Sequence, residues 1–283
     1  MPAPTRSILI TGCSSGIGHA CALGLAERGW QVIASARKPS DVKRLAQQGL
    51  SAVQLDLDDP DSIAAGLAQA LDGTEGRLDA LFNNGAYGQP GAVEDLTRAA
   101  LRAQFETNLF GWHDLTRRVI PIMRSQGHGR IVQNSSVLGL VAMPFRGAYV
   151  ASKFALEGLT DTMRQELVGS GIQVSLIEPG PILSRFRDNA FVAYQDGIDR
   201  DASVFKDTYG LMEARLLKEG PAQPFTLPPQ AVLKKLVHAL ESPRPRPRYY
   251  VTLPTQLLGT LRRVLSTRGL DGFMRKVSRG GRG

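Results

Sequence analysis

Short apolar runs alternate with longer stretches of helical periodicity through the first two thirds of this chain. A strand, a helix and another strand in succession build parallel sheets, because a crossover must return the chain before the next parallel strand. The alternation therefore predicts an α/β fold with a single Rossmann-type, doubly wound parallel sheet covered by helices on both faces. The expected strands cover residues 7–11, 31–36, 51–56, 80–83, 130–135, 173–178 and 248–253.

Helices are expected between these strands, and Pro121 should strain the longest of them. The rhythm stops after Pro179, and residues 184–220 suit a substrate lid or equally a loose loop. We expect one Rossmann domain over residues 1–255 and a helical C-terminal extension over residues 256–283. The expected helices cover residues 16–29, 41–48, 61–71, 101–124, 148–168 and 228–240.

The composition excludes several classes of protein. Of the 283 residues, 42% are hydrophobic and 21% are charged, which is ordinary for a globular chain and argues against disorder. The two cysteines, Cys13 and Cys21, suit a reducing compartment, and the dispersed histidines do not predict a metal site. Neither a signal peptide nor an apolar run long enough to span a membrane is visible, so we expect a cytoplasmic protein.

The net charge of +8 is concentrated near the end of the chain. Residues 256–283 hold seven basic residues and one acidic residue, so they carry +6 and the rest carries +2. Apolar residues there follow helical spacing, as in a basic amphipathic helix. Such a helix could contact an anionic membrane, but packing on the body or on a partner subunit is the favoured interpretation. Nucleic-acid binding is not expected, because no aromatic residues interleave with the basic ones.

A glycine-rich segment, TGCSSGIG from Thr11 to Gly18, lies between the first expected strand and helix. Glycine allows a tight turn there, and the helix N-terminus then favours a pyrophosphate, although an ordinary strand–helix turn would look similar. Arg37 and Lys38 follow the second strand, where a carboxylate would bind the 2′-hydroxyl of NAD. An arginine can hold a 2′-phosphate instead, which favours NADP(H), unless both are merely solvated charges.

Tyr149 and Lys153 lie four residues apart at the start of an expected helix, so they share one face. A nearby ammonium favours phenolate and lowers the pKa of a tyrosine towards the range that acid–base catalysis needs. Alone, this pair also fits an ordinary helix surface.

Six motifs nevertheless occur in one order. They are the glycine-rich segment, Asn83-Asn84-Gly85, Asn108, Ser135-Ser136, the Tyr149/Lys153 pair and Pro179-Gly180. Together they resemble the short-chain dehydrogenase/reductase family over residues 7–184. The end of the chain, with RPRPRYYVTLP, resembles a bacterial branch of NADP-dependent aldehyde reductases that is similar to 17β-hydroxysteroid and retinol dehydrogenases.

The resemblance implies an NADP(H)-dependent oxidoreductase that interconverts an apolar aldehyde or ketone and its alcohol by hydride transfer. It makes Tyr149 the catalytic acid/base and Lys153 the residue that lowers its pKa and holds the nicotinamide ribose. Ser136, 13 positions before Tyr149, would polarise the substrate carbonyl, and Asn108 would hold a water that relays protons. The alternatives are a steroid- or retinoid-type alcohol dehydrogenase and a non-catalytic dinucleotide-binding redox sensor. The retained serine, tyrosine and lysine favour an enzyme.

The same resemblance implies a set of cofactor-binding residues. They are Gly12, Ser14, Ser15, Gly16, Ile17, Gly18, Arg37, Lys38, Asp56, Leu57, Asn83, Gly85, Tyr149, Lys153, Pro179, Gly180, Ile182 and Ser184.

Two positions depart from the family pattern. The family usually has Asn-Asn-Ala-Gly where this chain has Asn-Asn-Gly85-Ala86, so we expect a small local shift near the cofactor. Ser184 replaces a common threonine and keeps its hydroxyl.

The candidate pocket residues are apolar and aromatic, so a small apolar carbonyl substrate is expected, with lid packing as the alternative role. Only Arg185 and Arg187 would offer charge to an anionic group there. The family's long helices pair subunits, which implies a homo-oligomer, a dimer or tetramer. The candidate pocket residues are Leu138, Val141, Met143, Phe145, Leu183, Phe186, Phe191, Tyr194, Phe205, Tyr209 and Met212.

Overall fold

A single parallel sheet organises the protein, whose computed structural model describes residues 5–221 and 224–280. The strand order is β3-β2-β1-β4-β5-β6-β7, and every neighbouring pair is parallel. The predicted doubly wound fold is therefore confirmed. The strands are β1 (Ser7–Ile10), β2 (Gln31–Ala36), β3 (Ser51–Gln54), β4 (Ala80–Asn83), β5 (Gly129–Asn134), β6 (Ile172–Glu178) and β7 (Arg248–Tyr250).

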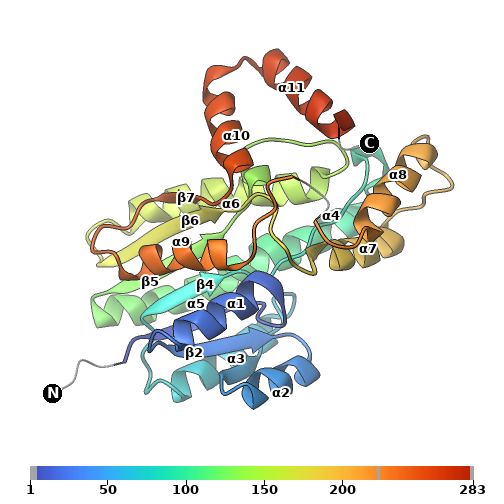
Figure 1. Ribbon diagram of the computed structural model, residues 1–283. Coiled ribbons are helices and arrows are strands. Elements are labelled where there is room, and N and C mark those ends of the chain that lie inside the picture. Colours follow the sequence, from blue (N-terminus) through green and yellow to red (C-terminus); the bar gives the residue numbers. More distant parts are fainter. Residues whose placement is uncertain (1–4, 222–223, 281–283) are drawn as a thin grey trace.

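Helices cover both faces of the sheet, and the alternation of side chains along each strand feeds two cores. In β1, Ile8 and Ile10 belong to one core and Leu9 to the other. One face carries α1 (Gly16–Ala26), α2 (Pro39–Gln47) and α9 (Gln230–Glu241), and the opposite face carries α3 (Pro60–Asp72), α5 (Gly111–Gln126) and α6 (Gly147–Glu166) (Figure 1).

The helix expected over residues 101–124 is not continuous. It consists of α4 (Arg98–Phe105), a π-helical turn over Glu106–Phe110, and α5. The interruption lies before Gly111, where a Cβ atom would come within 2.0 Å of the Leu57 carbonyl oxygen. The expectation of strain near Pro121 did not locate this feature, since Pro121 lies inside α5. The interruption arises instead where the helix meets the loop after β3.

Two helical pairs stand outside these layers. After β6 the chain forms α7 (Phe186–Gly197) and α8 (Lys206–Leu217), and after β7 it forms α10 (Leu253–Val264) and α11 (Thr267–Gly280) (Figure 1). Leu258 of α10 and Met274 of α11 pack on Leu140 and Val141, in the segment that follows β5. The apolar faces of the C-terminal extension are thus used, at least in part, against the body of the protein.

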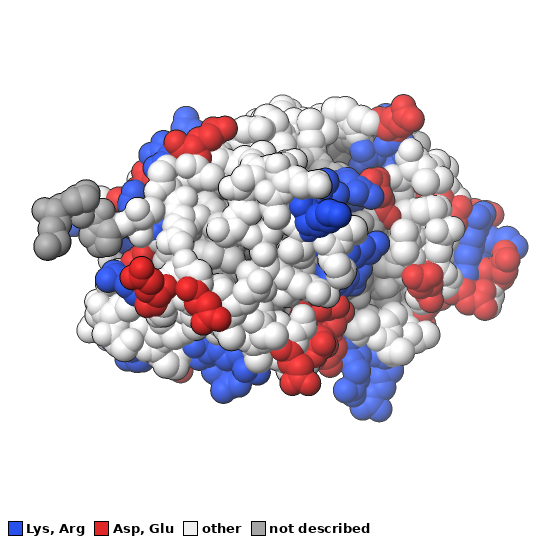
Figure 2. Space-filling view, turned by 90° about the horizontal axis from the view of Figure 1, so that it is seen from below, with Lys and Arg blue, Asp and Glu red and all other residues white. Residues whose placement is uncertain are grey.

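Basic and acidic side chains are interspersed on the face of the molecule that Figure 2 shows, and this face carries no continuous basic area. Across the described ranges 5–221 and 224–280, no helix combines the length and apolar character needed to cross a membrane.

Candidate active site

The glycine-rich segment forms a cradle between the ends of β1 and β4. Gly12 and Gly16 have φ angles of +70° and +59°, which favour glycine, and a Cβ atom on Gly12 would lie 2.5 Å from the Gly85 Cα. The Thr11 hydroxyl accepts hydrogen bonds from the backbone N–H groups of Asn84 (2.8 Å) and Gly85 (2.9 Å). Gly85 therefore lies where the loops after β1 and β4 touch, so the position at which this chain departs from the family order is one of close backbone contact.

The cradle fits the pyrophosphate of a dinucleotide. No side chain caps the N-terminus of α1 at Ser15, so its first N–H groups can bind an anion. A Cβ atom on Gly16 would come within 2.9 Å of the Ser184 Cβ, so the loop after β6 approaches the cradle closely. The strand order reverses between β1 and β4, and ligands of such sheets bind at this reversal, beyond the carboxyl ends of the strands.

Two cationic residues follow β2, where the adenosine part of the cofactor is expected. Arg37 and Lys38 are both exposed there. Burial raises the pKa of Asp58, and the hydrogen bond from the Thr107 hydroxyl and the charge of Arg37 oppose the rise. Arg44, which sequence reasoning missed, donates a 2.6 Å hydrogen bond to the Ser14 carbonyl and so braces the cradle. Its position on α2 gave no local signal of this contact.

The adenosine end also differs from expectation at Asn83. Its side chain is completely buried and donates a 2.9 Å hydrogen bond to the Thr116 hydroxyl on α5. The side chain of Asn83 is therefore engaged with α5 rather than open to the cradle. Asp56 and Leu57 follow β3 after one intervening residue. They lie next to the cradle, since a Cβ atom on Gly85 would lie 3.0 Å from the Leu57 Cδ1.

Ser136, Tyr149 and Lys153 come together from the end of β5 and the first turns of α6. The Ser136 hydroxyl accepts a hydrogen bond from the Leu138 N–H at 3.1 Å, which holds the turn after β5. Lys153 donates from Nζ to the Asn134 carbonyl at 2.9 Å and lies 5.7 Å from the centre of the Tyr149 ring. All three side chains are buried. The structure thus groups the residues that the motifs named.

Burial dominates the acid–base properties of this group. It raises the pKa of Tyr149 to about 12, against which a hydrogen bond with Ser136 acts. It lowers the pKa of Lys153 to about 7, against which Glu157 acts. The expected lowering of the Tyr149 pKa is not seen, because burial outweighs the hydrogen bond with Ser136. The Lys153 ammonium lies 4.2 Å from the centre of the Trp112 ring. Tyr149 is accordingly held as a proton donor.

Asn108 lies in the π-helical turn and joins three elements. Its side chain is fully buried, donates to the Tyr87 carbonyl at 2.8 Å and accepts from the Tyr87 N–H at 3.2 Å. Its amide also donates to the Ser152 hydroxyl at 3.4 Å, next to Lys153. The π-helical turn therefore fixes the segment after β4 to the helix that carries Tyr149 and Lys153.

The loop after β6 would border the nicotinamide. It contains Pro179, Gly180, Ile182 and Ser184. A Cβ atom on Gly180 would lie 2.1 Å from the hydroxyl of Thr252, the residue that caps α10. Sequence reasoning missed this support, because the two residues lie far apart in the chain.

A charged cluster behind the site was also missed. Arg248 of β7 contacts Glu157 and, at 2.5 Å, Asp161 of α6, together with Glu178 of β6 at 3.0 Å. Glu178 is fully buried, which raises its pKa to about 8 although Arg248 opposes the rise. The cluster links the helix that carries Lys153 to the strand that precedes Pro179.

Most of the candidate pocket residues pack inside the lid. Phe145 meets Phe205 and Tyr209 edge-on at 5.3 and 5.9 Å between ring centres, and Tyr209 is fully buried. Leu183 and Phe186 remain exposed, and the Phe186 ring packs against Tyr149 at 5.4 Å. These two residues are the best placed of the set to meet a substrate.

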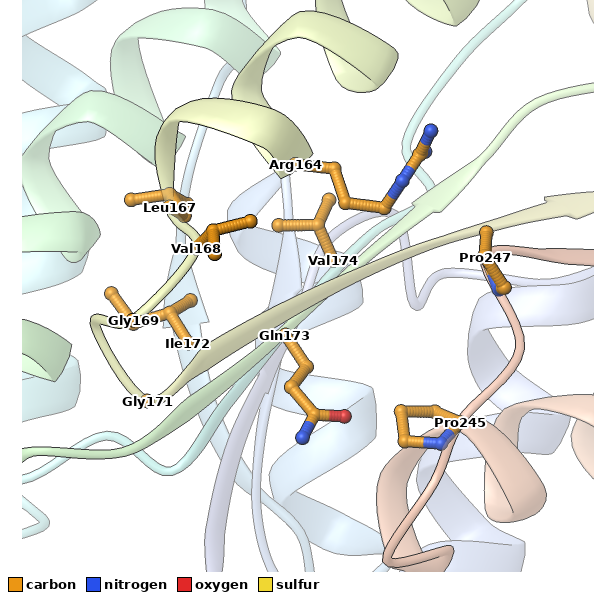
Figure 3. Close-up of a pocket in the computed structure, with 10 residues that line it drawn as sticks. All are labelled: Arg164, Leu167, Val168, Gly169, Gly171, Ile172, Gln173, Val174, Pro245 and Pro247. Carbon is orange, nitrogen blue, oxygen red and sulfur yellow. The ribbon is translucent and has the colours of Figure 1, made fainter.

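A cavity of about 340 Å³ lies elsewhere, at the amino-terminal end of β6 (Figure 3). Gln173, Pro245 and Pro247 are among the residues that line it. Ligands of doubly wound sheets bind at the carboxyl ends of the strands, so this cavity is separate from the candidate active site.

Residues 6–194 match the model of the family described as short chain dehydrogenase. The chain belongs to the short-chain dehydrogenase family. It is therefore an oxidoreductase of the kind that uses a nicotinamide dinucleotide.

Relatives of this short-chain dehydrogenase span nearly its whole length. An uncharacterized oxidoreductase of Escherichia coli (strain K12), YbbO, is 43% identical over 95% of this chain and 94% of its own. Human retinol dehydrogenase 8 is 35% identical over 95% of this chain and 89% of its own. The crystal structure of a short-chain dehydrogenase from Streptomyces avermitilis is 28% identical, covers 99% of both chains and has a TM-score of 0.76.

Proposed function

We propose that this short-chain dehydrogenase uses NADP(H) to interconvert an aldehyde or ketone with an apolar chain and the corresponding alcohol. The observation that carries the proposal is the grouping of Ser136, Tyr149 and Lys153 at the carboxyl ends of β5 and β6, beside the glycine cradle. A dinucleotide-binding sensor without turnover would not need a buried proton donor at this place.

When bound, the nicotinamide supplies or accepts the hydride. Tyr149 donates its hydroxyl proton to the substrate oxygen as negative charge develops there. Ser136 donates a second hydrogen bond to the same oxygen, which strengthens in the transition state because the oxygen becomes more negative. Lys153 holds the ribose hydroxyls with its ammonium group, and Asn108 keeps the segment after β4 against α6.

The preference for NADP(H) is supported by the exposed Arg37 and Lys38 after β2. An arginine at this place can form two parallel hydrogen bonds to a 2′-phosphate. Retinoid alcohols form a second candidate substrate class, since human retinol dehydrogenase 8 shares 35% identity over most of both chains.

We also propose a cytoplasmic location and a homo-oligomer. Free thiols at Cys13 and Cys21 support the first. The second is supported by exposed apolar side chains on the helices that would pair, Leu101, Phe110 and Leu159. Light scattering after gel filtration tests the oligomer, and a monomer at micromolar concentration would contradict it.

The substitution Tyr149→Phe tests the catalytic assignment. It keeps the ring that packs on Phe186 but removes the transferable proton, so turnover should fall at least ~100-fold, while NADPH binding is retained. NADPH consumption with a panel of aldehydes, ketones, steroids and retinoids measures turnover, and fluorescence of bound NADPH measures binding. If the Tyr149→Phe variant reduces its best substrate at the parent rate, the catalytic assignment is wrong and a non-catalytic redox sensor becomes the favoured alternative.

A further inference from the structure

A cation without an anionic partner lies directly before the catalytic helix. Arg146 precedes α6 by one residue and Tyr149 by three. Its Nη1 makes two long contacts, to the carbonyl of its neighbour Phe145 at 3.5 Å and to the Met212 sulfur at 3.9 Å. Within residues 5–221 and 224–280 it forms no ion pair. A partly buried cation in such surroundings is destabilised until an anion compensates it.

A second uncommitted cation lies beside it on α8. Arg215 lies on α8 three residues after Met212, whose sulfur contacts Arg146. Burial, with the like charge of Arg215 acting in the same direction, lowers the pKa of Arg146 to about 10. The guanidinium therefore stays charged at neutral pH. In the part of the chain that the structure describes, the Arg215 side chain has neither a hydrogen bond nor an ion pair. Two positive groups thus converge without compensation.

The arginines that the sequence suggested for an anion are committed elsewhere. Arg187 donates to the carbonyls of Arg215 at 3.3 Å and Lys218 at 2.6 Å, so it caps the end of α8. Arg185 is largely exposed and lies 3.8 Å from Asp188. These contacts occupy Arg187 and Arg185, whereas neither Arg146 nor Arg215 has a carboxylate partner among residues 5–221 and 224–280.

Two carboxylates of the lid helices, Glu213 and Asp188, have other partners. Glu213 accepts hydrogen bonds at 2.8 Å from the Tyr194 hydroxyl and from Arg200. Asp188 faces Arg185. Neither of these two carboxylates forms an ion pair with Arg146 or Arg215.

The backbone holds Arg146 in place at some cost. Phe145 has a φ angle of +59°, a conformation that non-glycine residues rarely adopt and that persists where surrounding contacts enforce it. The Gly91 N–H donates to the Phe145 carbonyl at 3.2 Å, and the Phe145 ring is fixed by Phe205 and Tyr209. The strained turn thereby delivers the guanidinium to the start of α6.

The two arginines are connected to Tyr149 through the first turn of α6 and through the lid. The Arg146 carbonyl accepts from the Val150 N–H at 2.8 Å, which makes Arg146 part of the first turn that carries Tyr149. From the other side, Tyr149 packs on Phe186, and the next residue, Arg187, binds the carbonyl of Arg215. The catalytic tyrosine and the cation pair are thus joined through both the lid and α6.

We propose that Arg146 and Arg215 bind a carboxylate of the substrate, so that the enzyme acts on apolar carbonyl compounds that carry an acid group away from the reacting carbon. This inference rests on the proposed function and narrows its substrate class. A guanidinium suits the task because its planar array of N–H groups matches the two oxygens of a carboxylate.

The test compares aliphatic ω-oxo carboxylates with their methyl esters, which have the same aldehyde and nearly the same chain. The parent enzyme should favour the acid in kcat/KM by ~10- to 100-fold, the range expected for a hydrogen bond between charged groups. Arg146→Met should bring this preference close to unity. Arg185→Met removes a charge from the same lid and should leave the preference unchanged. A series of chain lengths then reports the spacing between the carbonyl and the carboxylate.

Equal kcat/KM for acid and ester in the parent enzyme would overturn the proposal, as would a preference that survives in both Arg146→Met and Arg215→Met. Arg215→Met serves as the second variant if Arg146→Met does not fold, which circular dichroism shows.

Failure of the proposed function gives a different result. In that case no aldehyde is reduced, and a binding measurement decides the inference: a saturated fatty carboxylate, but not the alcohol of equal length, should raise the melting temperature of the parent protein with NADPH. This shift should disappear in Arg146→Met, and its absence in the parent protein counts against the carboxylate site.

Discussion

Replacing Arg248 with methionine removes the one cation that three carboxylates share. Methionine keeps much of the side-chain length but none of the charge. Of the three partners, Glu178 is fully buried and Glu157 is 9% exposed, whereas Asp161 is 36% exposed and contributes little because solvent screens it. The substitution therefore leaves two buried carboxyl groups facing each other without compensation. Breaking a buried ion pair in this way costs about 3–5 kcal/mol of the free energy of unfolding.

The size of this loss should depend on pH. Burial raises the pKa of Glu157 and that of Glu178, the latter to about 8, and Arg248 opposes both shifts. Without Arg248 both pKa values rise further above that of an unfolded glutamate, so the folded variant binds extra protons. Folding stability then falls as pH rises through that window. At lower pH the folded variant protonates these carboxyl groups, and the cost should shrink towards about 1–2 kcal/mol of lost hydrogen bonding.

Urea unfolding followed by tryptophan fluorescence at about pH 5, 7 and 9 measures the effect. Asp161→Asn is the control, because it removes an exposed partner of the same arginine and should change the free energy of unfolding by less than about 1 kcal/mol. A loss for Arg248→Met below about 1 kcal/mol at every pH, or one that shrinks as pH rises, would refute this account of the cluster.

Three further perturbations test the cofactor side of the site. Arg37→Asp should raise the KM for NADPH by ~10- to 100-fold and lower that for NADH, as steady-state kinetics with both cofactors would show; an unchanged KM for NADPH contradicts the assignment. Gly180→Ala should lower stability by about 1–3 kcal/mol in thermal unfolding, because its Cβ would meet the Thr252 hydroxyl at 2.1 Å, and a parent-like melting temperature would mean that the loop yields freely. Because burial lowers the pKa of Lys153 to about 7, the free enzyme loses this proton above that pH and must take one up to bind NADPH with a charged ammonium. Calorimetry in buffers of different ionisation enthalpy should detect this uptake at about pH 8, and buffer-independent heats would speak against it.

The elements of the sheet could be predicted because their signals are local. The strand predictions for Gln31–Ala36 and Ala80–Asn83 match the structure to the residue, since apolar runs of strand length end at polar or charged residues. The π-helical turn at Glu106–Phe110 could not be predicted, because its cause is the Leu57 carbonyl that Gly111 approaches from a distant part of the chain. Helices α7 and α8 were equally invisible, since their aromatic residues pack within the lid and give no clean amphipathic period.

In the candidate site, too, the residues with local sequence signals could be predicted and those that depend on distant contacts could not. Ser136, Tyr149 and Lys153 were recognisable because each lies at a fixed offset within its own motif. The unpaired state of Arg146 was not, because it depends on what α8 brings beside it. The same holds for Arg248, whose three partners come from two other elements.

The contact between Gly180 and Thr252 has a consequence for biosynthesis. The loop that would border the nicotinamide emerges from the ribosome about seventy residues before the residue that supports it. Strand β7 and the start of α10 must be translated before Thr252 can support that loop. The nicotinamide side of the site is therefore completed only after these elements are made, although its motifs are translated early. A nascent chain stalled before β7 would contain the glycine cradle but would lack the contact between Gly180 and Thr252. A chain truncated at the same place would lack that contact permanently.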